Sequence, residues 1–136
     1  MPTELTPFLA LAGGGLVVGV IAIVAILMRL GAAGNAVLAA TLSAGFMAFT
    51  AVTIANEGVF PVILNHTSNL WGVQVWWDLL FSLGVAFFLI APRARAQGMN
   101  LLPWTLFILA TASIGLLAMC ARLFWLEQTK SEGASA

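Results

Sequence analysis

The residue best placed to do chemistry in this chain is an acid inside an apolar stretch. Asp78 lies within residues 70–91, LWGVQVWWDLLFSLGVAFFLIA, with Gln74 four residues before it and Ser82 four residues after it. In a helix this spacing places the three side chains on one face, which we expect to point inward. A carboxylate near mid-membrane costs roughly 2.5–3.5 kcal/mol, so it requires a partner or a function.

Arg122 is the expected counter-ion of Asp78, because both fall near the same end of neighbouring spans. Glu57 and His66 come from that side as well, so the sequence predicts a polar cluster around one outer vestibule. Its members are Glu57, His66, Gln74, Asp78, Ser82 and Arg122. Two interpretations stay open: Asp78 and Arg122 neutralise each other and fix helix register, or the cluster is a working site.

Other chemistry finds less support in the sequence. Cys120 is the single cysteine, and no Cys/His spacing typical of zinc occurs. We therefore predict no metal site and no catalytic residue, since no nucleophile is matched with a base. His66 as a haem or chlorin ligand, with Trp76 and Trp77 stacked on the ring, is a further alternative.

The composition indicates the elements that position these residues. Hydrophobic residues make up 62% of the chain and charged residues 7%, with a mean hydropathy of +1.07. These values are typical of a protein in lipid, where helices satisfy their own backbone groups. We expect an all-α, integral membrane four-helix bundle and a single transmembrane domain over 1–136. Its four spans are about 8–30, 36–56, 70–91 and 102–126, and the tail 128–136 is expected to be disordered.

Charge in the short loops predicts the orientation. Arg29, Arg93 and Arg95 follow the first and third spans, whereas Arg122 and Lys130 are the cations of the opposite side. The positive-inside rule then places both termini outside the cytoplasm, in a multi-pass protein of a bacterial-type inner membrane. Interface anchors are expected at Trp71 and Trp125 on the outer side and at Trp104 on the inner side.

Small residues mark faces suited to helix packing. Gly15 and Gly19 form a small-xxx-small pair in the first span, and Ala40, Ala44 and Ala48 form a ridge in the second. The expected partners are membrane lipid and other transmembrane helices, in a larger complex or a homo-oligomer. Nucleic acid is excluded, because the net charge is +0 and no basic run is present.

The order of several features resembles a family of small bacterial three-span membrane proteins that is catalogued as a domain of unknown function. These features are, in order, an early acid (Asp78), a basic exit (Arg93 and Arg95), a glycine (Gly98), a tryptophan (Trp104), a short apolar run (108–111), an arginine (Arg122) and a final acid (Glu127). The resemblance covers about residues 37–127. It implies fold and topology, and it implies no site residue.

Three functions compete on this sequence. The first is a non-enzymatic accessory or interaction subunit of a larger membrane complex, supported by small loops and abundant packing surface. The second is a small oligomeric carrier coupled to protons or cations through Asp78. The third is a cofactor-binding or pigment-binding membrane protein that uses His66.

Overall fold

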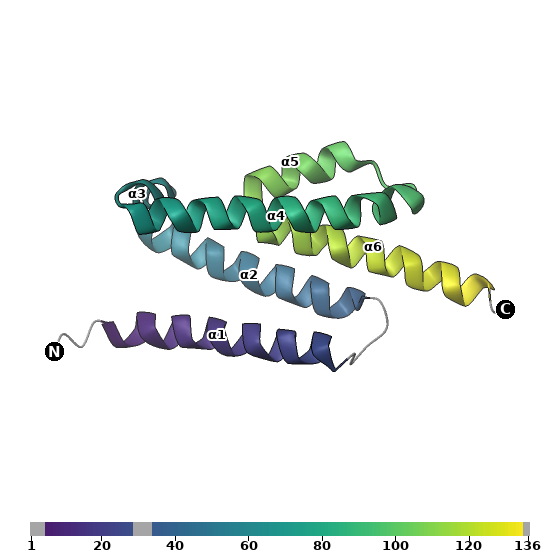
Figure 1. The fold of residues 1–136 in the computed structure, drawn as a ribbon, viewed down its shortest axis with the longest axis horizontal. Helices are drawn as coiled ribbons and strands as arrows, with labels where there is room; N and C mark the ends of the chain where they lie inside the picture. Colours follow the sequence, from purple (N-terminus) through teal and green to yellow (C-terminus); the bar gives the residue numbers. More distant parts are fainter. Residues whose placement is uncertain (1–4, 29–33, 135–136) are drawn as a thin grey trace. The chain divides into compact units, whose positions relative to one another are not determined.

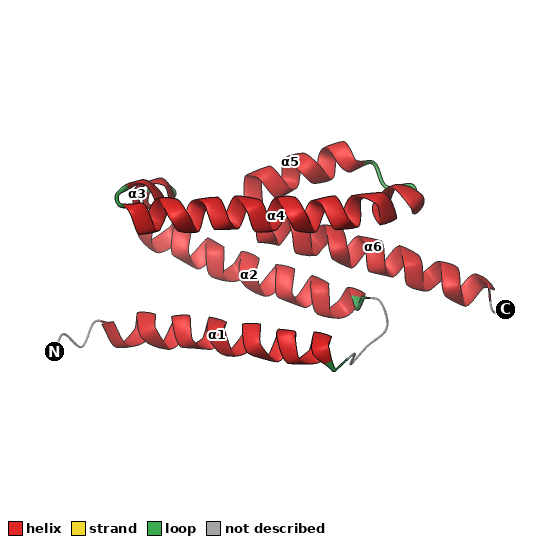
Figure 2. Cartoon of the chain, in the orientation of Figure 1, coloured by secondary structure: helices red, strands yellow, loops and turns green. Residues whose placement is uncertain are grey.

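The part of the chain that the structure describes is built from helices. The computed structural model describes residues 5–28 and 34–134, whose six elements are all helices (Figure 2). They belong to two units, Met1–Ala33 and Gly34–Ala136. The prediction of an all-α chain is confirmed.

The first unit contains one helix, α1, Leu5–Leu27. Its window Pro7–Val24 has a mean hydropathy of 2.3, which makes α1 apolar enough to cross a membrane. Within α1 itself nothing covers Gly15 or Gly19, so their predicted packing role stays a prediction. Arg29 and Leu30, at the end of the predicted first span, lie outside the described residues.

The second unit begins with α2, Ala36–Glu57, which Asn35 caps by accepting a 3.0 Å hydrogen bond from the Leu38 amide. This helix packs against α6, Ser113–Ala134, and its buried residues are Ala36, Ala39 and Ser43. The predicted ridge of Ala40, Ala44 and Ala48 is exposed instead. It lies next to the face that packs against α6, and its role in helix packing stays a prediction.

Two helices follow in a tight hairpin, α3, Pro61–Thr67, and α4, Leu70–Ala96 (Figure 1). Pro61 begins α3, where its missing N–H costs nothing, and Asn69 caps α4 with a 2.8 Å hydrogen bond from the Gly72 amide. Gly72 is needed here because a Cβ atom at this position would overlap the Asn65 carbonyl oxygen. The first turns of α4 are therefore held against α3.

The predicted fourth span, 102–126, is not a single helix in the structure. The structure has two helices there, α5, Leu101–Thr111, and α6, and between them Ala112 has φ +52° and ψ −118°. The chain reverses at this residue, and α6 packs back along α5 (Figure 1). Gly115 permits the reversal, since a Cβ atom there would stand 2.9 Å from the Ile108 backbone.

The predicted disordered tail is also wrong over its described part. Helix α6 continues through 128–134, and the hydroxyls of Thr129 and Ser131 donate hydrogen bonds to carbonyls of the preceding turn. Helix α6 carries four charged residues, Arg122, Glu127, Lys130 and Glu132, and it is not among the three helices that are long and apolar enough to span a membrane. Those three are α1, α2 and α4.

The core of the second unit lies where α4 ends. Ala94, Ile108, Met119 and Leu123 from α4, α5 and α6 are its buried members. Partly buried side chains surround them: Phe87, Ile90, Met99, Leu101, Trp104, Leu116 and Phe124. Toward its beginning α4 leaves this core, so only its second half is held by α5 and α6.

Because Ala112 occupies a backbone region that favours glycine, its replacement tests the reversal. Ala112→Gly is expected to raise the free energy of unfolding by about 1 kcal/mol, since glycine relieves the strained φ. Ala118→Gly, inside α6, is the matched control and should lower it by about 1 kcal/mol. Thermal unfolding of both variants in detergent measures the difference. If both variants lost the same free energy of unfolding, residue 112 would lie within a continuous helix.

Candidate functional site

The polar face of α4 lies on the exposed side of the helix. Gln74, Asp78 and Ser82 share one face, as the spacing predicts, and all three are exposed. The side of α4 that turns toward the core carries Phe87, Ile90 and Ala94. The expectation that the polar face points inward is therefore wrong for the isolated chain.

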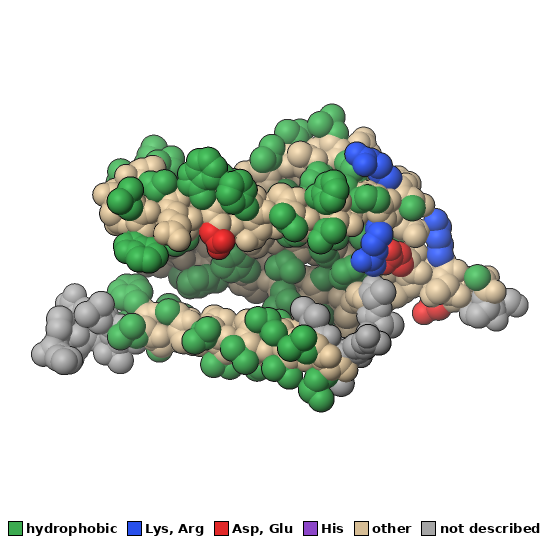
Figure 3. Space-filling view, viewed as in Figure 1, with side chains coloured by type: hydrophobic (Ala, Val, Ile, Leu, Met, Phe, Trp, Pro, Cys, Tyr) green, Lys and Arg blue, Asp and Glu red, His purple; other side chains and the backbone are tan. Residues whose placement is uncertain are grey.

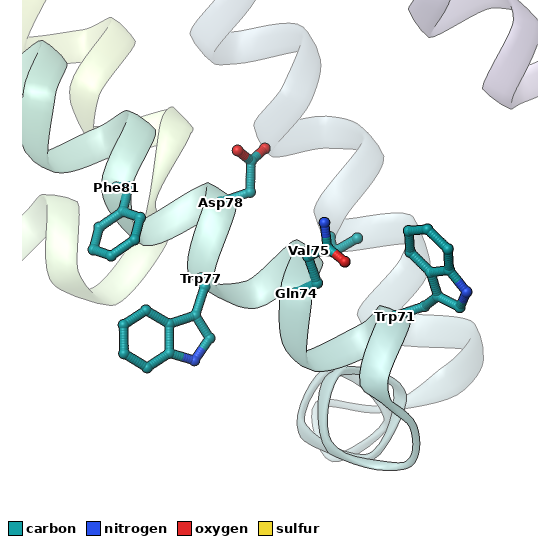
Figure 4. Close-up of a pocket in the computed structure, with 6 residues that line it drawn as sticks. All are labelled: Trp71, Gln74, Val75, Trp77, Asp78 and Phe81. Carbon is teal, nitrogen blue, oxygen red and sulfur yellow. The ribbon is translucent and has the colours of Figure 1, made fainter.

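Asp78 makes no hydrogen bond and no ion pair with any residue at 5–28 or 34–134. It lines a shallow hollow whose other members are Trp71, Gln74, Val75, Trp77 and Phe81, all from α4 (Figure 4). In this view its carboxylate projects away from the Trp77 and Phe81 rings, which meet edge to face with centroids 5.4 Å apart. The acid thus stands on the surface of an apolar helix and offers only acceptor atoms to a partner.

Arg122 does not reach Asp78. Its guanidinium carbon lies 4.6 Å from the centroid of the Trp125 ring, and no ion pair joins it to a carboxylate in the described part of the chain. The predicted pair fails because the chain reverses at Ala112 and carries Arg122 back toward the end of α4. Asp78 lies 15 residues before that end at Arg93, which is about 22 Å of helix.

His66 and Glu57 do not join Asp78 either. The Nδ1 atom of His66 is 2.5 Å from the Val62 carbonyl oxygen within α3, and the His66 ring packs on Trp76 with centroids 5.5 Å apart. Glu57, the last residue of α2, is exposed. The predicted outer cluster is therefore not assembled by contacts within this chain. A haem or chlorin role for His66 stays a prediction.

The ion pair that joins α4 to α6, Arg93 with Glu127, was not predicted. Arg93 donates from Nε to Oε1 of Glu127 at 3.0 Å and from Nη2 to Oε2 at 2.7 Å. The same guanidinium lies 5.6 Å from the centroid of the Phe124 ring. Such a two-pronged pair is among the stronger ionic contacts in proteins. It fixes the second half of α6 beside the end of α4.

The start of α2 joins this end of the unit as well. Gly34 has φ +112° and lies under the Phe124 ring, where a Cβ atom would overlap the ring carbons. Its carbonyl accepts a 3.3 Å hydrogen bond from Nε2 of Gln128. The beginning of α2 and the ends of α4 and α6 therefore meet, and Arg93, Phe124 and Gln128 hold them together.

The three predicted tryptophan anchors occupy different environments in the structure. Trp71 is 76% exposed at the start of α4, as an interface residue would be. Trp104, in the first turn of α5, is partly buried against the core, and its interface role stays a prediction. Trp125 is exposed but lies two residues before Glu127, at the opposite end of the unit from Trp71.

The described residues contain no group of three or more His, Cys, Asp or Glu side chains that could hold a metal ion. Comparisons of the chain with protein-family models, with curated proteins and with solved structures gave no match. The chemistry that the geometry offers is hydrogen bonding and ion pairing by one acid on an apolar helix.

The Arg93–Glu127 contact predicts energetic coupling between two residues that a fourth full span would separate by the membrane thickness. Arg93→Leu and Glu127→Leu, combined in a double-mutant cycle, should show a coupling of about 1 kcal/mol in the free energy of unfolding. Arg95→Leu, which removes a cation from the same helix end, is the matched control and should show no coupling to Glu127→Leu. Absence of coupling at both arginines would contradict the observed placement of α6.

Proposed function

We propose that this protein is a non-enzymatic subunit of a larger membrane complex. It binds another transmembrane helix of that complex through the polar face of α4. The proposal has three parts: insertion, orientation and the binding face. The observation that carries it is the exposed Asp78 carboxylate, which has no polar partner in the described chain.

Insertion is supported by α1, α2 and α4, which are long and apolar enough to cross a bilayer. Large apolar side chains are exposed along all three helices, as a lipid environment requires. Helix α5 has 11 residues, or about 16 Å of helix, and is too short for a ~30 Å hydrocarbon core. The proposed topology is therefore three crossings followed by an α5–α6 hairpin that enters and leaves on one side.

Orientation follows from the charges of the second unit. The Lys and Arg side chains visible in Figure 3 gather at the end where α4 and α6 end. This end contains Arg93, Arg95, Arg122 and Lys130, whereas Glu57, His66 and Asp78 belong to the other half. By the positive-inside rule the cationic end is cytoplasmic. We therefore place the C-terminus in the cytoplasm, in contrast to the expectation from four full spans, and the N-terminus outside.

The binding face consists of Gln74, Asp78 and Ser82. In lipid an exposed carboxylate is costly, and the surrounding α4 residues offer no cation to offset that cost. A partner helix with an arginine, a lysine or a hydroxyl at the same depth would satisfy it, with Gln74 and Ser82 supplying further hydrogen bonds. The exposed Ala40, Ala44 and Ala48 ridge of α2 offers a second close-packing surface to such a partner.

A carrier is the second candidate, because an unpaired acid within a membrane helix is also what a proton relay uses. The two functions differ in what Asp78 meets. A subunit needs Asp78 for association, whereas a carrier needs it for flux and can assemble without it.

The orientation is tested with reporters fused after Ala136. A C-terminal green fluorescent protein should be fluorescent and a C-terminal alkaline phosphatase inactive, because the proposed C-terminus lies in the cytoplasm. The same reporters fused after Val59, at the opposite end of the second unit, are the internal control and should give the reverse pattern. Phosphatase activity at Ala136 would mean that α5 and α6 together cross the membrane.

The binding face is tested with Asp78→Asn and Asp78→Leu. Both should reduce co-purification of the partner helix at least about tenfold, because the partner's polar group would be left buried and unpaired. Both should leave the melting temperature of the isolated chain unchanged or higher, since Asp78 has no hydrogen-bond or ion-pair partner among residues 5–28 and 34–134. Glu57→Gln, an acid outside the face, is the matched control for association. An Asp78 variant that melts at a lower temperature but still co-purifies with the partner helix would contradict the proposal.

A further inference from the structure

The polar face of α4 presents a row of unpaired groups. Gln74, Asp78 and Ser82 are exposed, and their side chains make no hydrogen bond or ion pair with any residue at 5–28 or 34–134. Successive members are four residues apart, or about 6 Å along the helix axis. Figure 4 shows the Gln74 amide and the Asp78 carboxylate on the side of the helix away from the Trp77 ring. A partner helix therefore meets three polar groups in one line.

This row carries a negative charge and more acceptors than donors. The two carboxylate oxygens of Asp78 only accept hydrogen bonds, whereas Gln74 and Ser82 each accept as well as donate. A partner hydroxyl or amide would donate to the carboxylate but would leave its charge uncompensated. In lipid such a bond recovers only part of the cost of a buried carboxylate. The chemistry of the polar face therefore favours a positively charged side chain on the partner.

Arginine fits the row better than lysine does. A guanidinium is planar and forms two parallel hydrogen bonds to one carboxylate, which here is Asp78. Its remaining N–H groups then point toward the neighbouring turns, where Gln74 and Ser82 supply acceptor oxygens. A lysine ammonium is a compact charge that is more strongly hydrated, so it loses more on leaving water.

The described chain has no cation at the depth of Asp78. The Arg93–Glu127 pair sets the register of α6 against α4, and Asp78 lies about 22 Å before Arg93 along α4. Arg122 precedes Glu127 by five residues, so it approaches the level of Asp78 by only about 8 Å. The other described cations of α4 and α6 lie farther away: Arg95 and Lys130. A second copy in the same orientation carries these cations at the same levels, so it cannot neutralise Asp78 with them.

We propose that the helix bound by the polar face of α4 belongs to a different protein and carries an arginine at the depth of Asp78. Asp78 lies eight residues after Leu70, or about 12 Å below the start of α4. In the proposed orientation this start is the outer end, which places the arginine eight residues from the outer end of the partner span. The proposed function is the premise of this assignment, which specifies the chemistry of its partner.

The test uses designed single-span helices as probes, each co-expressed with the tagged full chain and inserted with its N-terminus outside. The main probe has 20 residues, all leucine except for one arginine eight residues from the outer end. The tagged chain should capture it at least about tenfold more than an all-leucine probe. A lysine at the same position should be captured about threefold less than the arginine. A serine there, or an arginine eight residues from the inner end, should stay within about twofold of the all-leucine probe.

A charge exchange tests whether Asp78 itself is the contact. Asp78→Arg should lose the arginine probe and should capture a probe with aspartate at the same position, within about threefold of the original level. Gln74→Leu should weaken capture of the arginine probe about threefold, because the guanidinium loses one acceptor. Glu57→Gln, an acid outside the polar face, is the control and should change capture less than twofold. Melting temperatures should not fall in these variants, since Gln74, Asp78 and Glu57 are exposed.

Four results would overturn the assignment. They are equal capture of the serine or the lysine probe, capture of no probe above the all-leucine level, capture that survives Asp78→Arg, and self-association of the full chain that Asp78→Asn abolishes. The native partner separates these failures from failure of the proposed function. If Asp78→Asn still releases that partner, only the arginine assignment is lost. If the native partner stays bound to the Asp78→Asn variant, the proposed binding face is wrong as well.

Discussion

The reversal of the chain at Ala112 is the constraint on which the second unit depends. It turns an apolar stretch of membrane-spanning length into two helices that pack against each other, and it requires Gly115 because the backbones approach closely. Ser43, the buried polar residue of α2, donates a 3.0 Å hydrogen bond to the Ile114 carbonyl in the first turn of α6. The same residues that bring α5 and α6 together therefore also attach α2 to α6.

The direction of α6 after the reversal determines which charges meet. Glu127 arrives beside Arg93, and Arg122 stacks on Trp125 instead of extending toward Asp78. The charged groups of this unit are thereby sorted: the cations lie toward one end, and Asp78 is left on the α4 surface. The unusual backbone conformation of Ala112 thus separates an internal contact, Arg93 with Glu127, from an exposed surface, the polar face of α4.

Much of the helical architecture could be predicted because hydropathy alone marks α1, α2 and α4. Helix periodicity also placed Gln74, Asp78 and Ser82 on one face. It could not tell which face of α4 is buried, because apolar residues surround the acid on every side of the helix. That choice depends on where α6 packs, and the position of α6 depends on Ala112.

The break between α5 and α6 could not be predicted from the residue at which it occurs, Ala112. Alanine is the strongest helix former, and the hydropathy of 102–126 is continuous, so neither propensity nor composition marks residue 112. A weak signal was present in the neighbouring residues Thr111, Ser113 and Gly115, which favour helix ends over helix interiors. The Arg93–Glu127 pair was missed for the same reason, because a continuous fourth span puts the two residues on opposite sides of the membrane.

The half-length hairpin has a consequence for the lipid around the protein. In the proposed orientation α5 and the first half of α6 occupy the cytoplasmic half of the bilayer, beside α2 and α4, which continue through both halves. The second unit then displaces more lipid area from the cytoplasmic leaflet than from the outer one. A protein that is wider in the cytoplasmic leaflet fits best where the cytoplasmic surface of the bilayer is convex. Local membrane curvature therefore becomes a physical variable to which this fold is sensitive.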